Sequence, residues 1–214
     1  MERLAVRELP LFPLPNLVLF PEEVLPLHIF EHRYRMLLRT VLESDRRFGI
    51  VNINPETGQL CEVGCCAEVV QHKPIEGGRS NVVTVGQQRF RLLEIVREKP
   101  FRIGLVSWID DAPPAEPLQE LSCSVSGALT DVLTLTAKLT GKEVRMPDTL
   151  PSLPRELSFW VASHLHGATP HQQAMLEMTD TGQRLRHAYE LLDGTRRQLA
   201  ARTVLKDLES ESAS

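Results

Sequence analysis

A change in the hydrophobic repeat near residue 112 constrains the fold of this chain more than any other feature. Up to residue 111, short apolar or β-branched runs alternate with turns that contain glycine or proline, a pattern typical of strands. After the segment 112–117 (Ala-Pro-Pro-Ala-Glu-Pro), apolar residues recur at helical spacing. The sequence therefore predicts an α+β protein with a β-rich domain over 1–111, a helical bundle over 112–208 and a disordered tail over 209–214.

The β-rich half contains enough expected strands for a small barrel or a folded-over sheet. The expected strands are Leu17–Phe20, Val24–Ile29, Phe48–Ile53, Cys61–Val70, Asn81–Val85, Arg89–Val96 and Phe101–Ile109. One helix, Glu31–Leu42, is expected to interrupt them, because its apolar residues form one stripe. The proline-rich stretch Leu9–Pro21 is expected to wrap the edge of the sheet, since proline is confined to edge strands and bulges.

The second half contains several expected helices. They are Leu118–Lys142, with Gly141 as its C-terminal stop, Arg155–His166, a helix capped by Thr169 and Gln172, and a last helix that begins near Thr179–Thr181. A bend or break is expected at Gly194, since glycine in a helix costs about 1 kcal/mol relative to alanine.

Composition excludes several classes of protein. The formal charge of −4 argues against a dedicated nucleic-acid or membrane-surface binder, which carries a basic excess. Three of the four cysteines lie close together, so a reduced, cytoplasmic protein is expected. The N-terminal apolar stretch contains Pro10, Pro13 and Pro15, which would break the helix of a signal peptide. No apolar run reaches the roughly 18–20 residues that span a bilayer, and we expect no membrane association.

The segment His28-Ile-Phe-Glu31-His32 matches the H-x-x-E-H pattern of inverted zinc peptidases. On a helix, two histidines four residues apart can hold zinc while the glutamate acts as a base. Pro26 lies just upstream and favours an extended run, so the two histidines are not expected to share a helical face. A zinc-dependent hydrolase that uses His28, Glu31 and His32 is therefore the third hypothesis for this chain.

Other catalytic and cofactor motifs find little support. Cys61, Cys65 and Cys66 lack a second ligand pair at zinc-site spacing, and we expect buried strand cysteines. The sequence contains no G-x-S-x-G nucleophile elbow, no P-loop and no G-x-G-x-x-G. We therefore expect no enzyme activity and no cofactor.

A basic stripe late in the chain gives the alternative hypothesis of RNA binding. Its members are Arg184, Arg186, Arg196, Arg197, Arg202 and Lys206. Glu190 and Asp193 oppose them, so the stripe keeps a positive excess that can neutralise phosphates.

Several sequence blocks share an order that is similar to a known family. They are Leu9–Pro21 (Leu-Pro-Leu-Phe-Pro-Leu-Pro-Asn-Leu-Val-Leu-Phe-Pro), Leu25–Glu31, Arg33–Arg35, Phe48–Val51, Glu62–Glu68, Gly78–Ser80 and Val85–Arg91. Together they resemble the Lon protease N-terminal (substrate-binding) domain family. Looser similarity extends through Arg155–Trp160 and Leu176–Thr181, so the resemblance covers about residues 8–205.

The resemblance implies an N-terminal PUA-like β pseudobarrel with one helix, followed by a helical bundle. In full Lon proteases this region recognises unfolded or tagged substrates, and ATPase and peptidase domains follow it. Neither domain is recognisable in these 214 residues, so the resemblance implies a stand-alone, non-catalytic module. Its expected partners are unfolded polypeptides or a partner protein, and its expected role is that of an adaptor for proteolysis or quality control.

Two departures from the family pattern affect the expected site. Glu22-Glu23 stand where relatives commonly have a glycine turn, and His32 stands where a proline is frequent. The surface expected to contact peptides is drawn from apolar residues near the first helix and two arginines. It comprises Phe20, Pro21, Pro26, His28, Phe30, Tyr34, Arg79 and Arg89.

Overall fold

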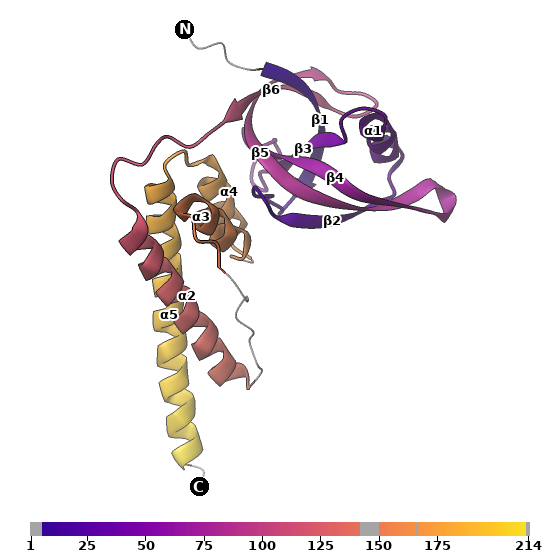
Figure 1. The fold of residues 1–214 in the computed structure, drawn as a ribbon. Helices are drawn as coiled ribbons and strands as arrows, with labels where there is room; N and C mark the ends of the chain where they lie inside the picture. The colour runs from indigo at the N-terminus through magenta and orange to yellow at the C-terminus, as the bar shows by residue number, and fades with distance from the viewer. Residues whose placement is uncertain (1–5, 142–149, 166, 213–214) are drawn as a thin grey trace. The chain divides into compact units, whose positions relative to one another are not determined.

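The computed structural model describes residues 6–141, 150–165 and 167–212, with side chains described up to residue 205. The chain divides into two compact units (Figure 1). The first contains Met1–Asp111 together with Ala162–Thr179, and the second contains Ala112–Val161 and Asp180–Ser214. The segment 162–179, which the sequence pattern assigned to the helical bundle, therefore belongs to the β-rich unit.

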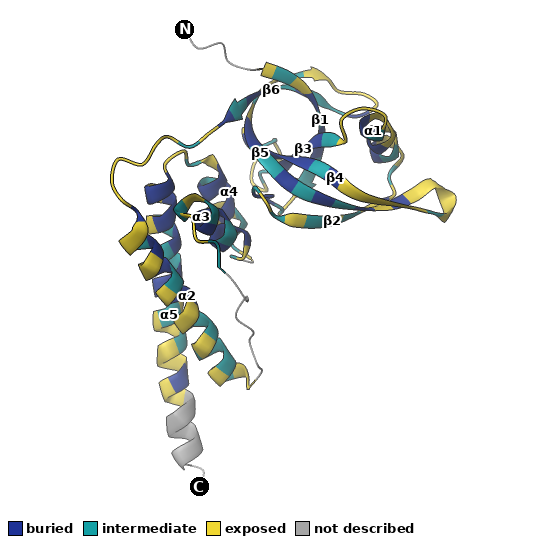
Figure 2. Ribbon diagram, in the orientation of Figure 1, coloured by how far each residue is buried: buried dark blue, intermediate teal, exposed yellow. Residues whose placement is uncertain are grey.

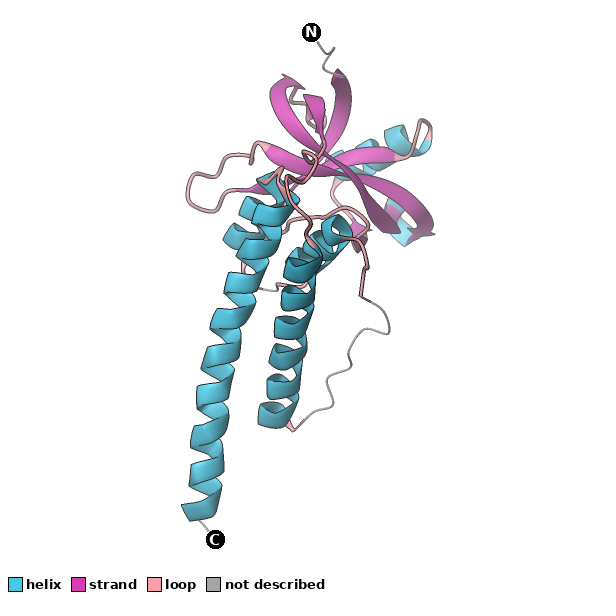
Figure 3. Ribbon diagram, turned by 60° about the vertical axis from the view of Figure 1, so that its left-hand side comes forward, coloured by secondary structure: helices cyan, strands magenta, loops and turns pink. Residues whose placement is uncertain are grey.

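The first unit is built on one six-stranded mixed sheet (Figures 1 and 3). Its strands are β1 (Val6–Pro15), β2 (Val24–Ile29), β3 (Arg47–Ile53), β4 (Val63–Ile75), β5 (Arg79–Arg97) and β6 (Ile103–Ile109). The order is β2-β5-β4-β3-β1-β6, and β5 also pairs with β6. The pairings β5-β4-β3-β1-β6-β5 therefore form a closed circuit, to which β2 adds at β5.

Strand β5 closes this circuit because it is long enough to pair with three neighbours. Its first part pairs with β2 and β4, and its second part pairs with β4 and β6. The sequence pattern divided it into two strands, Asn81–Val85 and Arg89–Val96. The structure corrects this division, since the ladder continues through Gly86, opposite Ala67 on β4.

Strand β1 corrects a second expectation. The proline-rich N-terminal stretch was expected to wrap the edge of the sheet, but β1 lies between β3 and β6. Its first half, Val6–Pro10, pairs antiparallel with β6, and its second half, Leu11–Pro15, pairs parallel with β3. Because each half pairs mainly on one side, proline, which lacks a backbone N–H, is tolerated in a strand inside the sheet order. The run Leu17–Phe20, expected as a strand, has no regular secondary structure.

Helix α1 (His32–Leu42) packs its apolar stripe onto the sheet (Figure 2). Tyr34, Leu37, Leu38 and Val41 are buried in a core cluster that also includes strand residues such as Phe48. Burying an aliphatic or aromatic side chain of this kind contributes about 1.5–3 kcal/mol. This cluster therefore fixes α1 on the sheet and so positions the residues at its start.

A tight turn joins the N-terminal region to β2. Glu22 has a backbone φ of 66°, in the left-handed region that glycine favours. The amide N–H of Glu23 donates to the carbonyl of Phe20 at 3.2 Å, and the Glu23 carboxylate accepts from the Phe20 N–H at 2.9 Å. Glu22, which stands where relatives commonly have a glycine turn, therefore has a positive φ.

The segment 162–179 is held in the first unit by buried polar contacts. Arg89 on β5 donates from Nη1 to the carbonyl oxygens of Leu176 and Met178, each at 2.6 Å, and from Nη2 to Asp111. The side-chain amide of Gln173 donates to the carbonyl of Val63 on β4 at 3.1 Å. These long-range bonds explain why this segment belongs with the sheet.

Helix α4 (Thr169–Glu177), within that segment, differs from its expected cap. Its N-cap residue is Ala168, and no side chain caps it, so the expected Thr169–Gln172 capping box is wrong. The Gln172 side chain instead donates to the carbonyl of Ala162 at 3.0 Å.

The second unit is helical. It contains α2 (Gln119–Thr140), α5 (Thr181–Ser212) and most of α3 (Pro154–Ser163). Helix α2 ends at Gly141 with φ 65°, as expected for a glycine C-cap. None of the described helices is sufficiently long and apolar to cross a membrane.

Helix α5 continues through Gly194, so the expected break is absent from this helix. Beyond Gly194, Arg196 pairs with Asp131 of α2 at 3.2 Å, and α2 and α5 pack against each other. Packing between two long helices outweighs the cost of about 1 kcal/mol for one glycine. The helix also includes residues 209–212 of the expected disordered tail, and residues 213–214 lie outside the described range.

Candidate functional site

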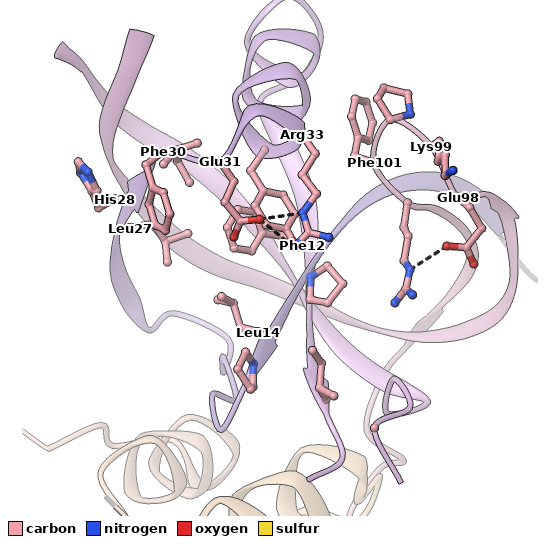
Figure 4. A pocket seen from close by; sticks show the side chains of 18 residues that line it. Phe12, Leu14, Leu27, His28, Phe30, Glu31, Arg33, Glu98, Lys99 and Phe101 are labelled. Carbon is pink, nitrogen blue, oxygen red and sulfur yellow. Dashed lines mark hydrogen bonds and ion pairs between the residues drawn. The ribbon is translucent and has the colours of Figure 1, made fainter. Parts of the chain in front are cut away.

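The first unit contains a cleft of about 1190 Å³ beside the start of α1 (Figure 4). Four parts of the chain border it: the second half of β1, the junction of β2 with α1, the end of β3 with the turn after it, and the loop before β6. The lining residues are Phe12–Pro15, Leu27–Glu31, Arg33, Tyr34, Ile53, Gly58 and Glu98–Arg102.

Aromatic side chains form the floor of the cleft. The rings of Phe12 and Tyr34 stack with 4.1 Å between centroids, and Phe12 also contacts Phe48 at 5.9 Å. All three are buried in the core cluster, and Phe12 and Tyr34 also line the cleft. Burial is the main cause that raises the pKa of the Tyr34 phenol, while nearby Arg33 lowers it. The floor is thus an apolar, neutral surface.

Phe30 stands at the margin of the cleft and is 60% exposed. Its ring lies 5.9 Å from the ring of His28, which contacts Asn81 through Nδ1 at 2.7 Å. Figure 4 shows Leu27, His28 and Phe30 on one side, with Lys99 and Phe101 on the opposite side. A large exposed aromatic ring at the mouth of an apolar cleft is typical of a binding surface.

Most charged groups of the cleft pair with each other. Arg33 pairs with Glu31 at 2.8 Å, and Arg102 pairs with Glu98 at 2.9 Å. Lys99 forms no ion pair among the residues that the structure describes. These exposed pairs contribute little to stability. They do leave the cleft close to neutral, which favours apolar ligands over strongly charged ones.

Only part of the expected peptide-contact set lies together. His28, Phe30 and Tyr34 line the cleft, but the other five residues do not. Phe20 is buried in the turn before β2, and Arg89 is buried and bonded to segment 162–179. Their burial leaves them no surface to offer a ligand.

The remaining three expected residues are accessible but lie outside the lining of the cleft. Pro26 is exposed on β2, and Pro21 is half-buried in the turn. Arg79 is exposed beside the β4–β5 turn, where its Nε donates to the carbonyl of Glu76 at 3.2 Å. Their role in peptide contact stays a prediction.

Most lining residues of the cleft were not in the expected set, among them Phe12, Leu14 and Phe101. Phe12 and Leu14 belong to the proline-rich stretch that the sequence singles out, so a signal was present for them. Phe101 follows the Lys99-Pro100 turn, in the loop that joins β5 to β6, and β6 pairs with both β1 and β5.

The apparent zinc motif is divided between two elements. His28 lies in β2, whereas His32 is the first residue of α1, as the upstream proline predicted. Within the described part of the chain, no group of three His, Cys, Asp or Glu side chains is placed to hold a metal ion.

The clustered cysteines are strand residues. Cys65 and Cys66 are buried in β4, and Cys61 is half-buried just before it. Burial raises the pKa of the Cys66 thiol to about 12, so this thiol stays protonated and unreactive at neutral pH.

The basic stripe of α5 is largely neutralised within the second unit. Arg184 is fully buried, where it donates to Ser158 at 2.8 Å and lies 3.9 Å from the Phe159 ring centroid. Three other arginines pair with carboxylates: Arg186 with Glu116, Arg196 with Asp131 and Asp193, and Arg197 with Asp193. Arg202 is exposed. The side chain of Lys206 lies outside the described residues. RNA binding by this stripe stays a prediction. The ion pairs do not favour it, because they already neutralise much of the positive charge that would bind phosphates.

Comparison with known proteins gives one consistent family. Residues 8–194 match the model of the ATP-dependent protease La (LON) substrate-binding domain. The chain is 24% identical to a Lon protease of Cytophaga hutchinsonii over 194 residues, which are 86% of this chain and 24% of that protein. It is 26% identical to Lon protease 2 of Myxococcus xanthus over 196 residues, 88% of this chain and 24% of that protein. The chain thus spans about a quarter of the length of these relatives.

Solved structures share the fold. A Lon N-terminal domain protein from Xanthomonas campestris has a TM-score of 0.60 and 22% identity, over 84% of this chain and 95% of that one. The N-terminal domain of a Mycobacterium avium complex Lon protease has a TM-score of 0.61 and 18% identity, over 87% and 98% of the two chains.

Proposed function

This chain belongs to the family of ATP-dependent protease La (LON) substrate-binding domains, and from that premise we propose that its cleft binds hydrophobic segments of polypeptides. The observation that carries the proposal is the exposed ring of Phe30 beside an apolar floor, where Glu31 and Glu98 are already paired with Arg33 and Arg102. Such a surface takes up apolar side chains without desolvating an unpaired carboxylate.

Backbone geometry supports an extended ligand. Strand β2 pairs with β5, and no pairing to its other edge is formed by the described strands. A free strand edge that leads into an apolar cleft suits strand addition, in which backbone bonds give affinity with little dependence on sequence. Pro26 lacks an N–H, so it restricts the register in which a peptide can pair with this edge.

We further infer that the protein binds its clients without changing them chemically. The described residues that line the cleft include no serine, threonine or cysteine that could act as a nucleophile. The protein acts as a non-catalytic adaptor that presents unfolded clients for proteolysis or quality control. Its location is cytoplasmic, where unfolded clients and reduced cysteines occur together.

The architecture of the first unit suits this role. We propose that the strands form the PUA-like pseudobarrel that the resemblance implies, and the closed pairing circuit supports this proposal. A closed circuit leaves few free strand edges, so a client can add mainly at β2, beside the cleft.

The test is a binding measurement with a labelled, permanently unfolded polypeptide, read by fluorescence anisotropy. Phe30→Ala removes the exposed ring and is expected to weaken binding about tenfold or more, as for an aromatic residue at a binding centre. Leu93→Ala is the matched control, because Leu93 is a 48% exposed apolar residue outside the cleft. Equal affinity for the wild type and Phe30→Ala, or no binding by the wild type, would contradict the proposal.

A further inference from the structure

A second, smaller groove lies between α1 and the β4–β5 hairpin of the first unit. Its volume is about 490 Å³. It is lined by His32, Arg35, Met36, Leu38, Arg39, Leu42, Glu43, His72, Gly78 and Ser80. None of these residues lines the hydrophobic cleft.

The two depressions are lined by different residues, although both linings include members of the core cluster between α1 and the sheet. Ser80 and Asn81 are consecutive on β5, so their side chains point to opposite faces. His28 of the cleft contacts Asn81 at 2.7 Å, whereas His72 of the groove contacts Ser80 at 3.0 Å through Nε2. The groove is therefore a separate site that the hydrophobic cleft does not explain.

Helix α1 contributes a basic stripe to the groove. Four of its residues share one helical face, because they follow the spacing i, i+3, i+4 and i+7: His32, Arg35, Met36 and Arg39. The exposed sides of Met36 and Leu42 give this face an apolar component beside the charges. A ligand that fits it therefore combines negative charge with aliphatic carbon.

The positive charge of the groove is poorly neutralised. Its charged side chains are Arg35, Arg39 and Glu43, and His32 and His72 also line it. Glu43 pairs with Arg39 at 3.2 Å, and both are highly exposed. Arg35 forms no ion pair among the residues described. One guanidinium is thus left for a ligand.

Gly78 makes room for that guanidinium. A Cβ built at residue 78 would overlap Nη2 of Arg35, so the side chain lies directly against the hairpin backbone. Gly78 also has a φ of 72°, which glycine adopts without strain. The hairpin therefore holds Arg35 along the wall of the groove.

We propose that this groove binds acidic side chains of the same polypeptide whose hydrophobic segment occupies the cleft. The inference rests on the proposed function and specifies its substrate class: an apolar segment with an acidic flank. Charge complementarity with Asp and Glu carboxylates selects the flank, and the aliphatic floor packs their methylene groups. The β2–α1 junction joins the sites, since Phe30 and Glu31 border the cleft and His32 borders the groove.

The test compares three synthetic peptides with one apolar core and flanks of Asp, Asn or Lys. Binding is measured by anisotropy at two salt concentrations. The Asp-flanked peptide is expected to bind about five- to tenfold more tightly than the Asn-flanked peptide at low salt, with a smaller difference at high salt. Arg35→Gln is expected to remove most of that difference. Lys73→Gln is the matched control, because exposed Lys73 follows His72 on β4 but lies outside the groove lining.

The outcomes separate the two proposals. If the Asp and Asn peptides bind equally and Phe30→Ala loses binding, the proposal for the cleft stands and the proposal for the groove is overturned. Equal losses in Arg35→Gln and Lys73→Gln would indicate only overall charge and would also overturn it. Equal affinity for an acidic peptide without the apolar core would overturn the link between the sites. If none of the three peptides binds, both proposals fail.

Discussion

The ring of Phe12 on β1 stacks against the ring of Tyr34 on α1, with 4.1 Å between their centroids and 28° between their planes. This contact joins a strand near the N-terminus to the helix that carries one wall of the cleft. Both rings are buried on the core side and line the cleft on the other. The pair therefore contributes both to folding and to the shape of the site.

Tyr34→Leu tests this double role. The substitution removes the ring stack, and we expect a loss of about 1–2 kcal/mol in the free energy of unfolding together with weaker peptide binding. Urea denaturation and anisotropy measure the two effects. Tyr34→Phe keeps the ring and is the control, so equal losses in both variants would show that the hydroxyl group, and not the stack, is responsible.

Glu22→Gly tests the turn before β2. Glu22 has a φ of 66°, and glycine relieves the associated strain. We expect stability to rise by about 0.5–1 kcal/mol after the entropic cost of glycine in the unfolded chain. Glu22→Ala keeps a Cβ and should not stabilise the protein. A gain of the same size in both variants, measured by urea denaturation, would assign the effect to the lost carboxylate.

Glu23→Gln tests a pH effect in the same turn. Burial raises the pKa of Glu23 from 4.5 to about 7, while the hydrogen bond from the Phe20 N–H lowers it. The folded state thus keeps this proton at a pH where the unfolded state has lost it, so Glu23 lowers stability progressively as pH rises from about 4.5 to 7. The advantage of Glu23→Gln over the wild type should grow across that window and then level off.

The size of that advantage is about 1–2 kcal/mol once solvent screening of a half-buried group is allowed for. Urea denaturation at several pH values measures it. Glu22→Gln removes a neighbouring carboxylate and controls for the loss of one negative charge. A constant difference between wild type and Glu23→Gln across the window from about 4.5 to 7 would show that the carboxyl titrates alike in both states.

Gly194→Ala tests the continuity of α5. Gly194 is exposed within the helix, and a Cβ there meets nothing within 4 Å. We expect a gain of about 1 kcal/mol in stability, and the same for Gly127→Ala in α2. Gly141→Ala should instead destabilise, because Gly141 has a φ of 65°. Loss of stability in Gly194→Ala would mean that α5 bends in solution.

Local sequence patterns predicted the helices and those strands whose residues alternate regularly and contain few prolines. Val24–Ile29 is β2 as expected, and α1 and α2 begin and end within a few residues of their predicted bounds. The same reasoning missed β1, because its prolines argue against a strand inside a sheet. The prolines are tolerated because each half of β1 pairs mainly with one strand. That pairing depends on β3 and β6, which are distant in the sequence.

The site was predictable where its residues are neighbours in sequence. His28, Phe30 and Tyr34 were found together because they lie at one strand–helix junction. Arg89 was assigned to the surface, since an arginine on a strand is usually exposed. Its burial depends on the carbonyl groups of Leu176 and Met178, which no local pattern in the sequence connects with β5.

The bonds of Arg89 to Leu176 and Met178 have a consequence for synthesis on the ribosome. The first unit lacks its last segment, 162–179, until α2 and α3 have been translated. A nascent chain that has released only residues 1–111 therefore carries a guanidinium whose carbonyl acceptors do not yet exist. We expect the β-rich unit to reach its native state late in translation, so the order of synthesis does not match the order of the two folded units.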